Sequence, residues 1–506
     1  MAVDTQIHAS DVSVRPDRAT MLIYFAALTA MFMAVLDMNI VVTALPTITG
    51  ELGDVNLLGW VGAAYLLSSA AVAPFYGKLG DMYGRKTIVL VAVALFLAGS
   101  LACGLAWSMP ALIGARVLQG LGGGGLMVSA FAMIGELFEP RERAKYQGYS
   151  SAAFTLASVV GPIGGGYLTD LLGWRSVFLV NLPIALAVFA VVAIAMKRRA
   201  DGQRHTVDYA GGVLLAIATV AVVYWADHLF DGTGTSWINL ALPVNAIVTI
   251  AAFIAVERRA PEPIIPLRLF ANRTVTLVAV ISLLVGIGTL GMYFYFALYV
   301  QMITGVSPGA MGLLLTPLPI AVSIASILSG RAVARTGRYK WLPVAGIALG
   351  TLLMPTYLWV GPQTPTPFLL LGFAVFGVSM GLVFQTLLTA IQAAAPPKDI
   401  GAATAVITQA RTVGASLGLA LNGAVMIAGL TAANNRLPDD AAAAIPQGLQ
   451  QLVPHVANAL PPALRDTVLN TYVGGFVPMY LMLTGIYAVA LLLSLFLPNV
   501  QLPKRA

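Results

Sequence analysis

Long apolar runs separated by short polar segments make up almost the whole chain. A helix needs about 17 to 25 mostly apolar residues to cross the roughly 30 Å hydrocarbon core of a bilayer. Fourteen runs are long enough to do so. We therefore predict an all-α membrane protein with fourteen transmembrane helices, at approximately 21–43, 57–76, 87–107, 110–133, 146–171, 176–196, 209–226, 238–256, 274–303, 309–333, 341–360, 366–393, 401–430 and 474–497.

The composition supports a membrane location. Hydrophobic residues fill 58% of the 506 positions and charged residues only 10%, and the mean hydropathy is +0.86. These values exclude a soluble domain of this length. The first apolar run is too long for the core of a signal peptide and lacks a small-residue cleavage site, so we keep it as the first helix.

Basic residues are divided unequally between the two sides of the predicted membrane. Of the 28 Lys and Arg residues, 23 lie on the side of the N-terminus and three lie in the opposite loops. The positive-inside rule then predicts that both termini are cytoplasmic. The net charge of +7 reports this orientation and implies no nucleic-acid partner. The compact loops suit the inner membrane of a bacterial cell.

An internal repeat divides the chain into two halves. The segment Gly77 to Lys86, Gly-Lys-Leu-Gly-Asp-Met-Tyr-Gly-Arg-Lys, has a degraded copy at Gly330 to Tyr339, in which Ala334 replaces Asp81. The offset between the copies is half the chain length, as in a protein with two related halves. We expect a cytoplasmic tail at 1–20, a six-helix bundle at 21–199, two inserted helices with linkers at 200–273, and a second six-helix bundle at 274–506 with an outer loop at about 431–473.

Asp37 is the one carboxylate that the pattern places deep in the membrane. It lies about 24 Å along its helix from Met21, and Arg116 lies about 9 Å from the opposite end of its own helix at Pro110. Their depths are similar in a core of roughly 30 Å, so we predict that the two side chains are partners. The pair is either a structural ion pair or a proton-coupling site. Burial disfavours the charged form of an aspartate and a neighbouring arginine favours it, so small structural changes can load or release a proton.

Two further motifs occupy the first half. One predicted helix contains Arg116-x-x-Gln119-Gly, and the next contains Gly161-Pro162-x-x-Gly165. Glycines permit close approach of membrane helices, and proline removes a backbone donor. Packing accounts for the glycines but not for a buried arginine.

Together with the Gly-x-x-x-Asp-x-x-Gly-Arg loop, these motifs resemble those of the major facilitator superfamily, most closely its fourteen-helix drug:H+ antiporters. The resemblance implies two six-helix bundles with two inserted helices between them. It implies that a loop motif latches the cytoplasmic side against the helix starting near Gly401, through Gly77, Asp81, Gly84 and Arg85. It also implies an antiporter motif, typical of exporters, at Gly161, Pro162 and Gly165.

The residues that contact the substrate are harder to locate from the sequence than the motifs are. In the first helix, Asn39 takes the place of a family threonine, which bears on ligand preference. Arg411 lies about 15 Å along its helix from Gly401, and either helix carbonyls and Gln409 satisfy it or it awaits an anionic group. The expected cavity residues are Asn39, Gln119, Tyr293, Tyr299 and Arg411. The outer loop caps the exit path or rests on the bilayer, and no periplasmic partner is predicted.

The expected function is export of lipophilic, cationic drugs or toxic compounds by proton-coupled antiport with alternating access. The alternative is an exporter of a lipid or an anionic metabolite with the same fold. No cluster of His, Cys or carboxylates offers catalytic or metal chemistry, so an enzyme is not expected. Cys103 is the only cysteine. The expected partners are the lipid bilayer, protons and a small lipophilic substrate, and no cofactor is expected because the proton gradient drives transport.

Overall fold

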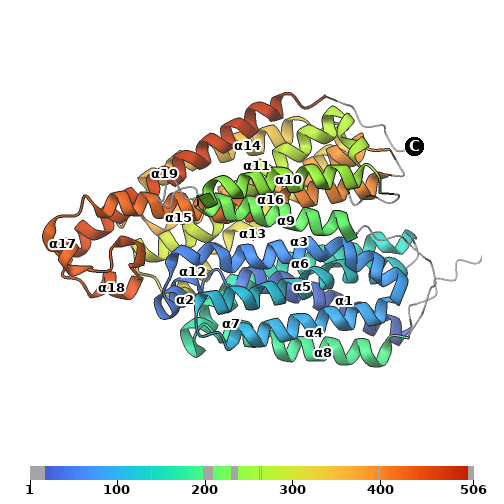
Figure 1. Ribbon diagram of the computed structural model, residues 1–506, viewed down its shortest axis with the longest axis horizontal. Helices are drawn as coiled ribbons and strands as arrows, with labels where there is room; N and C mark the ends of the chain where they lie inside the picture. The colour runs from blue at the N-terminus through green and yellow to red at the C-terminus, as the bar shows by residue number, and fades with distance from the viewer. Residues whose placement is uncertain are drawn as a thin grey trace, which may run out of the picture.

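Long helices lying side by side form the molecule in the computed structural model (Figure 1). The structure describes residues 17–137, 140–197, 209–228, 237–260, 263, 265–396 and 399–499. In these ranges it contains α- and 3-10 helices and no strand. The first half comprises α1 (Arg18–Ile40), α2 (Leu45–Leu52), η1 (Val55–Leu57), α3 (Leu58–Tyr83), α4 (Arg85–Gly104), α5 (Met109–Leu137), α6 (Pro140–Leu172), α7 (Ser176–Leu179) and α8 (Asn181–Ala195).

The inserted segment and the second half follow in chain order. The insert consists of α9 (Tyr209–His228) and α10 (Trp237–Glu257). The second half comprises η2 (Leu267–Ala271), α11 (Arg273–Thr304), α12 (Pro308–Leu315), α13 (Pro317–Thr336), α14 (Trp341–Leu353), η3 (Met354–Trp359), α15 (Thr366–Ala394), α16 (Ile400–Asn434), α17 (Asp439–Ala444), η5 (Leu449–Gln451), α18 (Pro454–Ala459) and α19 (Pro462–Leu495).

Each predicted span coincides with a helix. Among the described residues, ten helices are long and apolar enough to cross a bilayer, and shorter apolar stretches lie in α3, α9 and α10. The remaining span corresponds to α6, which is 33 residues long. The prediction of an all-α membrane protein is therefore confirmed.

Two helix ends differ from the predicted bounds. Asp17 caps α1 by accepting a hydrogen bond from the Thr20 backbone N–H at 2.8 Å, so the helix begins at Arg18 and the expected tail of 1–20 is shorter. The outer loop spans 435–461 and not 431–473, because both flanking helices continue beyond their apolar cores. Pro462 starts α19 at a position where its missing N–H costs no helical hydrogen bond.

The two halves pack in related ways. In the first half α6 packs on α1, and α5 packs on α3 and α4; in the second half α16 packs on α11, and α15 packs on α13 and α14. The loops of the internal repeat also correspond, since Gly84 has φ +86° and Gly337 has φ +68°. This left-handed region favours glycine, which explains why both copies keep one there.

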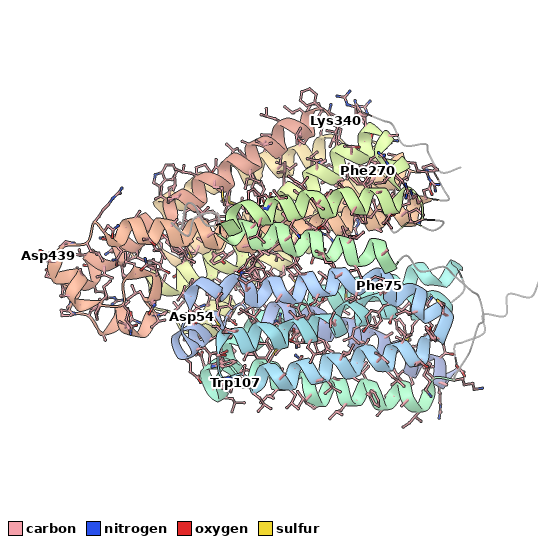
Figure 2. The ribbon with its side chains drawn as sticks, in the orientation of Figure 1. Asp54, Phe75, Trp107, Phe270, Lys340 and Asp439 are labelled. Carbon is pink, nitrogen blue, oxygen red and sulfur yellow. The ribbon has the colours of Figure 1, made fainter. Side chains whose placement is uncertain are left out.

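The two ends of the molecule differ. The start of α1 and the end of α19 lie at one end, which we call the terminal end, together with the labelled Phe270 and Lys340 (Figures 1 and 2). Asp54, Trp107 and Asp439 mark the opposite end, which we call the far end (Figure 2).

At the far end the halves are in direct contact. Asp170 of α6 accepts hydrogen bonds from Ser307 Oγ at 3.0 Å and from the backbone N–H of Gly309 at 2.9 Å, at the start of α12. An added Cβ atom at Gly312 would overlap the carbonyl oxygen of Pro162. These contacts close the far end between α6 and α12.

The inserted helices lie across the boundary between the halves (Figure 1). α9 contacts both α3 and α16. A small apolar cluster joins the three helices, and the rings of Trp60 and Tyr224 lie 6.0 Å apart. The insert therefore contacts both halves and does not belong to either packing pattern.

Candidate functional site

Asp37 lies buried in the first half in contact with Arg116. Arg116 Nη1 donates to Asp37 Oδ2 at 2.5 Å, and the two side chains are 1% and 0% exposed. The predicted partnership of these residues is thus confirmed. Their helices bring them together because Asp37 lies near the far end of α1 and Arg116 lies two turns from the start of α5.

The carboxylate of Asp37 has two more donors. Gln119 Nε2 and Asn181 Nδ2 donate to Asp37 Oδ1 at 2.7 and 2.6 Å. The same two amides contact Ser100 Oγ at 2.7 and 3.1 Å, so one hydroxyl of α4 connects α5 with α8. Donors from α5 and α8 therefore hold one carboxylate of α1, in a fully buried polar network that also includes Ser100 of α4.

Arg116 is held on several sides. Its Nε donates to the carbonyl oxygen of Val61 at 3.0 Å, and its Nη1 also donates to Gln119 Oε1 at 2.7 Å. The guanidinium carbon lies 4.4 Å from the centre of the Tyr65 ring. A buried charge pair is tolerated only with such additional partners, because desolvation otherwise exceeds the attraction between the charges.

Gln119, which the sequence predicts to line the substrate cavity, belongs to the polar network of Asp37 in this structure. Its side chain is 0% exposed and serves Asp37, Arg116 and Ser100. Gly99 of α4 permits this position, since a Cβ atom there would overlap the backbone of Gln119. Asn39, also expected in the cavity, is half-buried and donates to the Val35 carbonyl oxygen of its own helix at 2.8 Å.

The antiporter motif lies between the Asp37 helix and the other half. A Cβ atom at Gly161 would lie 2.7 Å from Asn39 Cβ, and one at Gly165 would overlap the carbonyl oxygen of Ile40. Thr43 Oγ1 donates to the carbonyl oxygen of Pro162 at 3.3 Å. α6 therefore contacts α1 within a few residues of Asp37 and, through Pro162, contacts α12.

The predicted latch lies at the terminal end. Arg85 Nη1 donates to the carbonyl oxygen of Gly77 at 3.0 Å across the turn at Gly84. The backbone of Asp81 belongs to the last turns of α3, but its side chain lies outside the described part of the chain. At the start of α16, Arg268 Nη2 donates to Asp399 Oδ1 at 2.7 Å. The role of Asp81 as a latch stays a prediction.

The aromatic residues of α11 are core residues. Tyr299 is 0% exposed, its hydroxyl donates to the carbonyl oxygen of Val360, and its ring centre lies 4.9 Å from that of Phe476. Tyr293 is 7% exposed and packs against Phe294. This part of α11 packs against α16, α19 and α15, so Tyr293 and Tyr299 are buried in this conformation, and their place in a substrate cavity stays a prediction.

Arg411, a predicted cavity residue, lines a small cavity. The cavity lies between α11, α15 and α16 and measures about 10 Å³, which is room for about one water molecule. It is lined by Ser282, Val285, Val383, Phe384, Leu387, Ile407 and Arg411. The guanidinium carbon of Arg411 lies 4.9 Å from the centre of the Phe384 ring.

The sequence reading missed Asn181 and Ser100. Asn181 begins α8 and is separated from Asp37 by 144 positions, and Ser100 lies in the apolar α4. The sequence signal for Asn181 was an amide side chain at the first position of an otherwise apolar helix. In the described parts of the chain, no group of three or more His, Cys, Asp or Glu side chains is placed to hold a metal ion.

Comparisons with known proteins agree with this arrangement. Residues 27–419 match the family model described as Major Facilitator Superfamily. An uncharacterised MFS-type transporter of Mycobacterium tuberculosis is 34% identical over 501 residues, covering 98% of this chain and 72% of the relative. Multidrug transporter protein MdtP of Bacillus subtilis is 36% identical over 405 residues, covering 78% of this chain and 73% of the relative.

A solved structure shares the fold. It is a bacterial homologue of the human lysosomal transporter Spinster in an inward-facing and occupied conformation, with a TM-score of 0.67 and 15% identity. The alignment covers 96% of this chain and 97% of that one. The family and these relatives are membrane transporters and not enzymes. The chain belongs to the major facilitator superfamily.

Proposed function

We propose that this transporter is a proton-coupled antiporter that exports lipophilic compounds across the inner membrane by alternating access. The terminal end is cytoplasmic in this proposal, as the distribution of basic residues predicts. Relatives that are named as multidrug transporters support the export of drug-like compounds. The observation that carries the proposal is the buried carboxylate of Asp37, which accepts hydrogen bonds from residues of α5 and α8.

The Asp37 site has partners for both protonation states. The ionised carboxylate accepts from Arg116, Gln119 and Asn181. Among the described residues, Asn181 Oδ1 is buried and accepts no hydrogen bond. A protonated Asp37 would need an acceptor for its new O–H, and rotation of the Asn181 amide would present that oxygen. Proton binding then changes the hydrogen-bond pattern around Asp37, since Asn181 turns from a donor into an acceptor.

The antiporter motif links this site to the other half. α6 contacts α1 beside Asp37 through Gly161 and Gly165, and it contacts α12 through Pro162. A shift of α1 on protonation would therefore be transmitted to the closed far-end contact. In this scheme the far end opens with the substrate bound, a proton from outside then reaches and neutralises Asp37, and the substrate leaves on that side.

The test uses purified protein in liposomes with an imposed pH gradient. Uptake of ethidium, a lipophilic cation, and the internal pH are followed together for the wild type, Asp37→Asn and Asp54→Asn. Asp54 is an exposed aspartate at the far end and serves as the matched control. We expect gradient-driven movement with proton counterflow in the wild type and Asp54→Asn, and none in Asp37→Asn. Gradient-driven transport by Asp37→Asn would contradict the proposal.

The charge of the substrate is a separate question. The sequence predicts cationic substrates, which would require an acid facing the ligand. Both oxygens of Asp37 are engaged by protein donors and the side chain is buried, whereas the cation Arg411 lines a cavity. This observation favours the second candidate function, the export of anionic lipophilic compounds. Proton-coupled movement of an anionic dye in place of ethidium would support it.

A further inference from the structure

An open groove of about 570 Å³ lies on the outer surface of the first half, where α4 and α8 pack side by side at one edge of the molecule (Figure 1). Its volume is within the range of roughly 300 to 1,000 Å³ that ligand sites have. Both helices belong to segments long and apolar enough to cross a bilayer, so this surface faces lipid. The groove is lined by Lys86, Thr87, Leu90, Val91 and Ala94 of α4 and by Phe189 of α8.

The groove has a polar end and an apolar end. Lys86 and Thr87 belong to the first turn of α4, at the terminal end of the molecule. Lys86, Leu90 and Ala94 follow one another at intervals of four residues and so lie on one face of the helix. Ala94 is about 12 Å farther along α4 than Lys86. The groove therefore offers a cation near the membrane surface and hydrocarbon side chains at the depth of the acyl chains.

Positive charge gathers at the polar end of the groove. Arg85 and Lys86 occupy the first turn of α4, which contains no acidic residue, and no side chain caps this helix. The N-terminus of a helix already carries a partial positive charge, so cations there are unfavourable and an anion is favourable. Lys197, which is exposed, follows the end of α8 by two residues. An anion bound at this end of the groove would offset the excess of positive charge.

Lys86 is positioned to bind such an anion. Its Nζ donates to the carbonyl oxygen of Ala193, near the end of α8, at 2.6 Å. An ammonium group has three donors, so two remain for another acceptor. None of the ion pairs among the described residues includes Lys86. The contact with α8 therefore holds the ammonium at the polar end of the groove without neutralising its charge.

We infer that this groove binds one anionic phospholipid, whose phosphate accepts hydrogen bonds from Lys86 and one of whose acyl chains lies along Leu90, Ala94 and Phe189. An acyl chain gains little by moving from the surrounding lipid into an apolar groove, because both environments are equally apolar. The preference for this lipid must come from the charge of its head group, as in basic pockets between transmembrane helices. The inference concerns the lipid-facing surface and does not depend on the proposed transport function.

The experiment is native mass spectrometry of the delipidated full-length protein. The protein is titrated with phosphatidylglycerol, which is anionic, or with phosphatidylcholine of the same acyl chains, which is zwitterionic. A third series adds glycerol 3-phosphate, a head group without chains, as a competitor. The variants are Lys86→Gln and Ala94→Trp. The matched control is Lys340→Gln, which removes a half-buried lysine at the start of α14, outside the groove.

We expect phosphatidylglycerol to bind the wild type more tightly than phosphatidylcholine does. Lys86→Gln should weaken binding of the anionic lipid roughly fivefold, the effect of one cation near a charged membrane surface, and should change binding of the zwitterionic lipid less than twofold. Ala94→Trp fills the apolar end of the groove and should weaken the binding of both lipids. Lys340→Gln should bind both lipids as the wild type does.

Three results would overturn the inference. They are equal affinity of the wild type for the two lipids, unchanged binding of phosphatidylglycerol in Lys86→Gln or in Ala94→Trp, and displacement of that lipid by glycerol 3-phosphate, which would assign the site to a soluble phosphate. Ala94 is exposed on the lipid-facing surface, so Ala94→Trp keeps the test open if Lys86→Gln does not fold. No transport is measured here, so failure of the lipid site would leave proton coupling through Asp37 intact.

Discussion

Removing Arg116 should destabilise the first half strongly. Arg116→Gln leaves the carboxylate of Asp37, which is 0% exposed, without its cation and leaves the Val61 carbonyl oxygen without its donor. Loss of one partner of a buried pair costs about 3 to 5 kcal/mol. The amide donors of Gln119 and Asn181 remain, so we expect the lower part of this range.

Cys103 reports this change. It is the only cysteine, it is 0% exposed, and its Sγ lies 3.5 Å from Gln119 Oε1, so a thiol-reactive dye reaches it only when the site opens. When opening and closing are fast relative to labelling, the labelling rate follows the opening equilibrium. A loss of about 3 kcal/mol then raises the rate roughly 100-fold. The measurement is the labelling rate in detergent at constant temperature.

Two comparisons make the result specific. Arg175→Gln removes an arginine of a half-exposed pair with Glu51 and should change the rate less than about fivefold, since exposed pairs contribute below about 1 kcal/mol. The double variant Asp37→Asn, Arg116→Gln removes both charges and should label more slowly than Arg116→Gln alone. If Arg116→Gln labels within fivefold of the wild type, the reasoning is refuted, and Asp37 does not carry a charge in the resting protein.

Three further predictions concern packing, pH and the far end. Gly165→Ala should impair folding or transport because its Cβ atom would overlap Ile40, whereas Gly164→Ala should be tolerated because nothing lies within 4 Å, and transport by both variants checks this. The hydrogen bond from Arg175, with a smaller contribution from Trp174, lowers the pKa of the exposed Glu51 below its ordinary 4.5. The stabilisation, below about 1 kcal/mol, is present above pH 4.5 and is lost as the pH falls through the lowered pKa, so unfolding curves of wild type and Glu51→Gln should converge in acid. Asp170→Ala removes two contacts between the halves and should widen the distance between spin labels on the far-end loops of the two halves; an unchanged distribution would show that other contacts close that end.

The sequence by itself determined where the helices lie. Apolar runs of membrane length coincide with helices throughout the described chain, because in lipid every backbone polar group must be satisfied within the helix. It also identified Asp37 and Arg116 as partners, since a charge in the membrane needs one and only these two matched in depth. Element ends were less well determined, because α19 continues past the apolar run into a polar segment.

The tertiary structure decided which side chains share a site. Depth along a helix follows from counting residues, but the direction in which a side chain points depends on how each helix is rotated against its neighbours. Gln119 therefore donates to Asp37, and Tyr299 lies in an aromatic core. Asn181 contacts Asp37 although 144 positions separate them, and Arg411 lies beside a cavity and not beside a carboxylate. Both placements result from the packing of several helices at once.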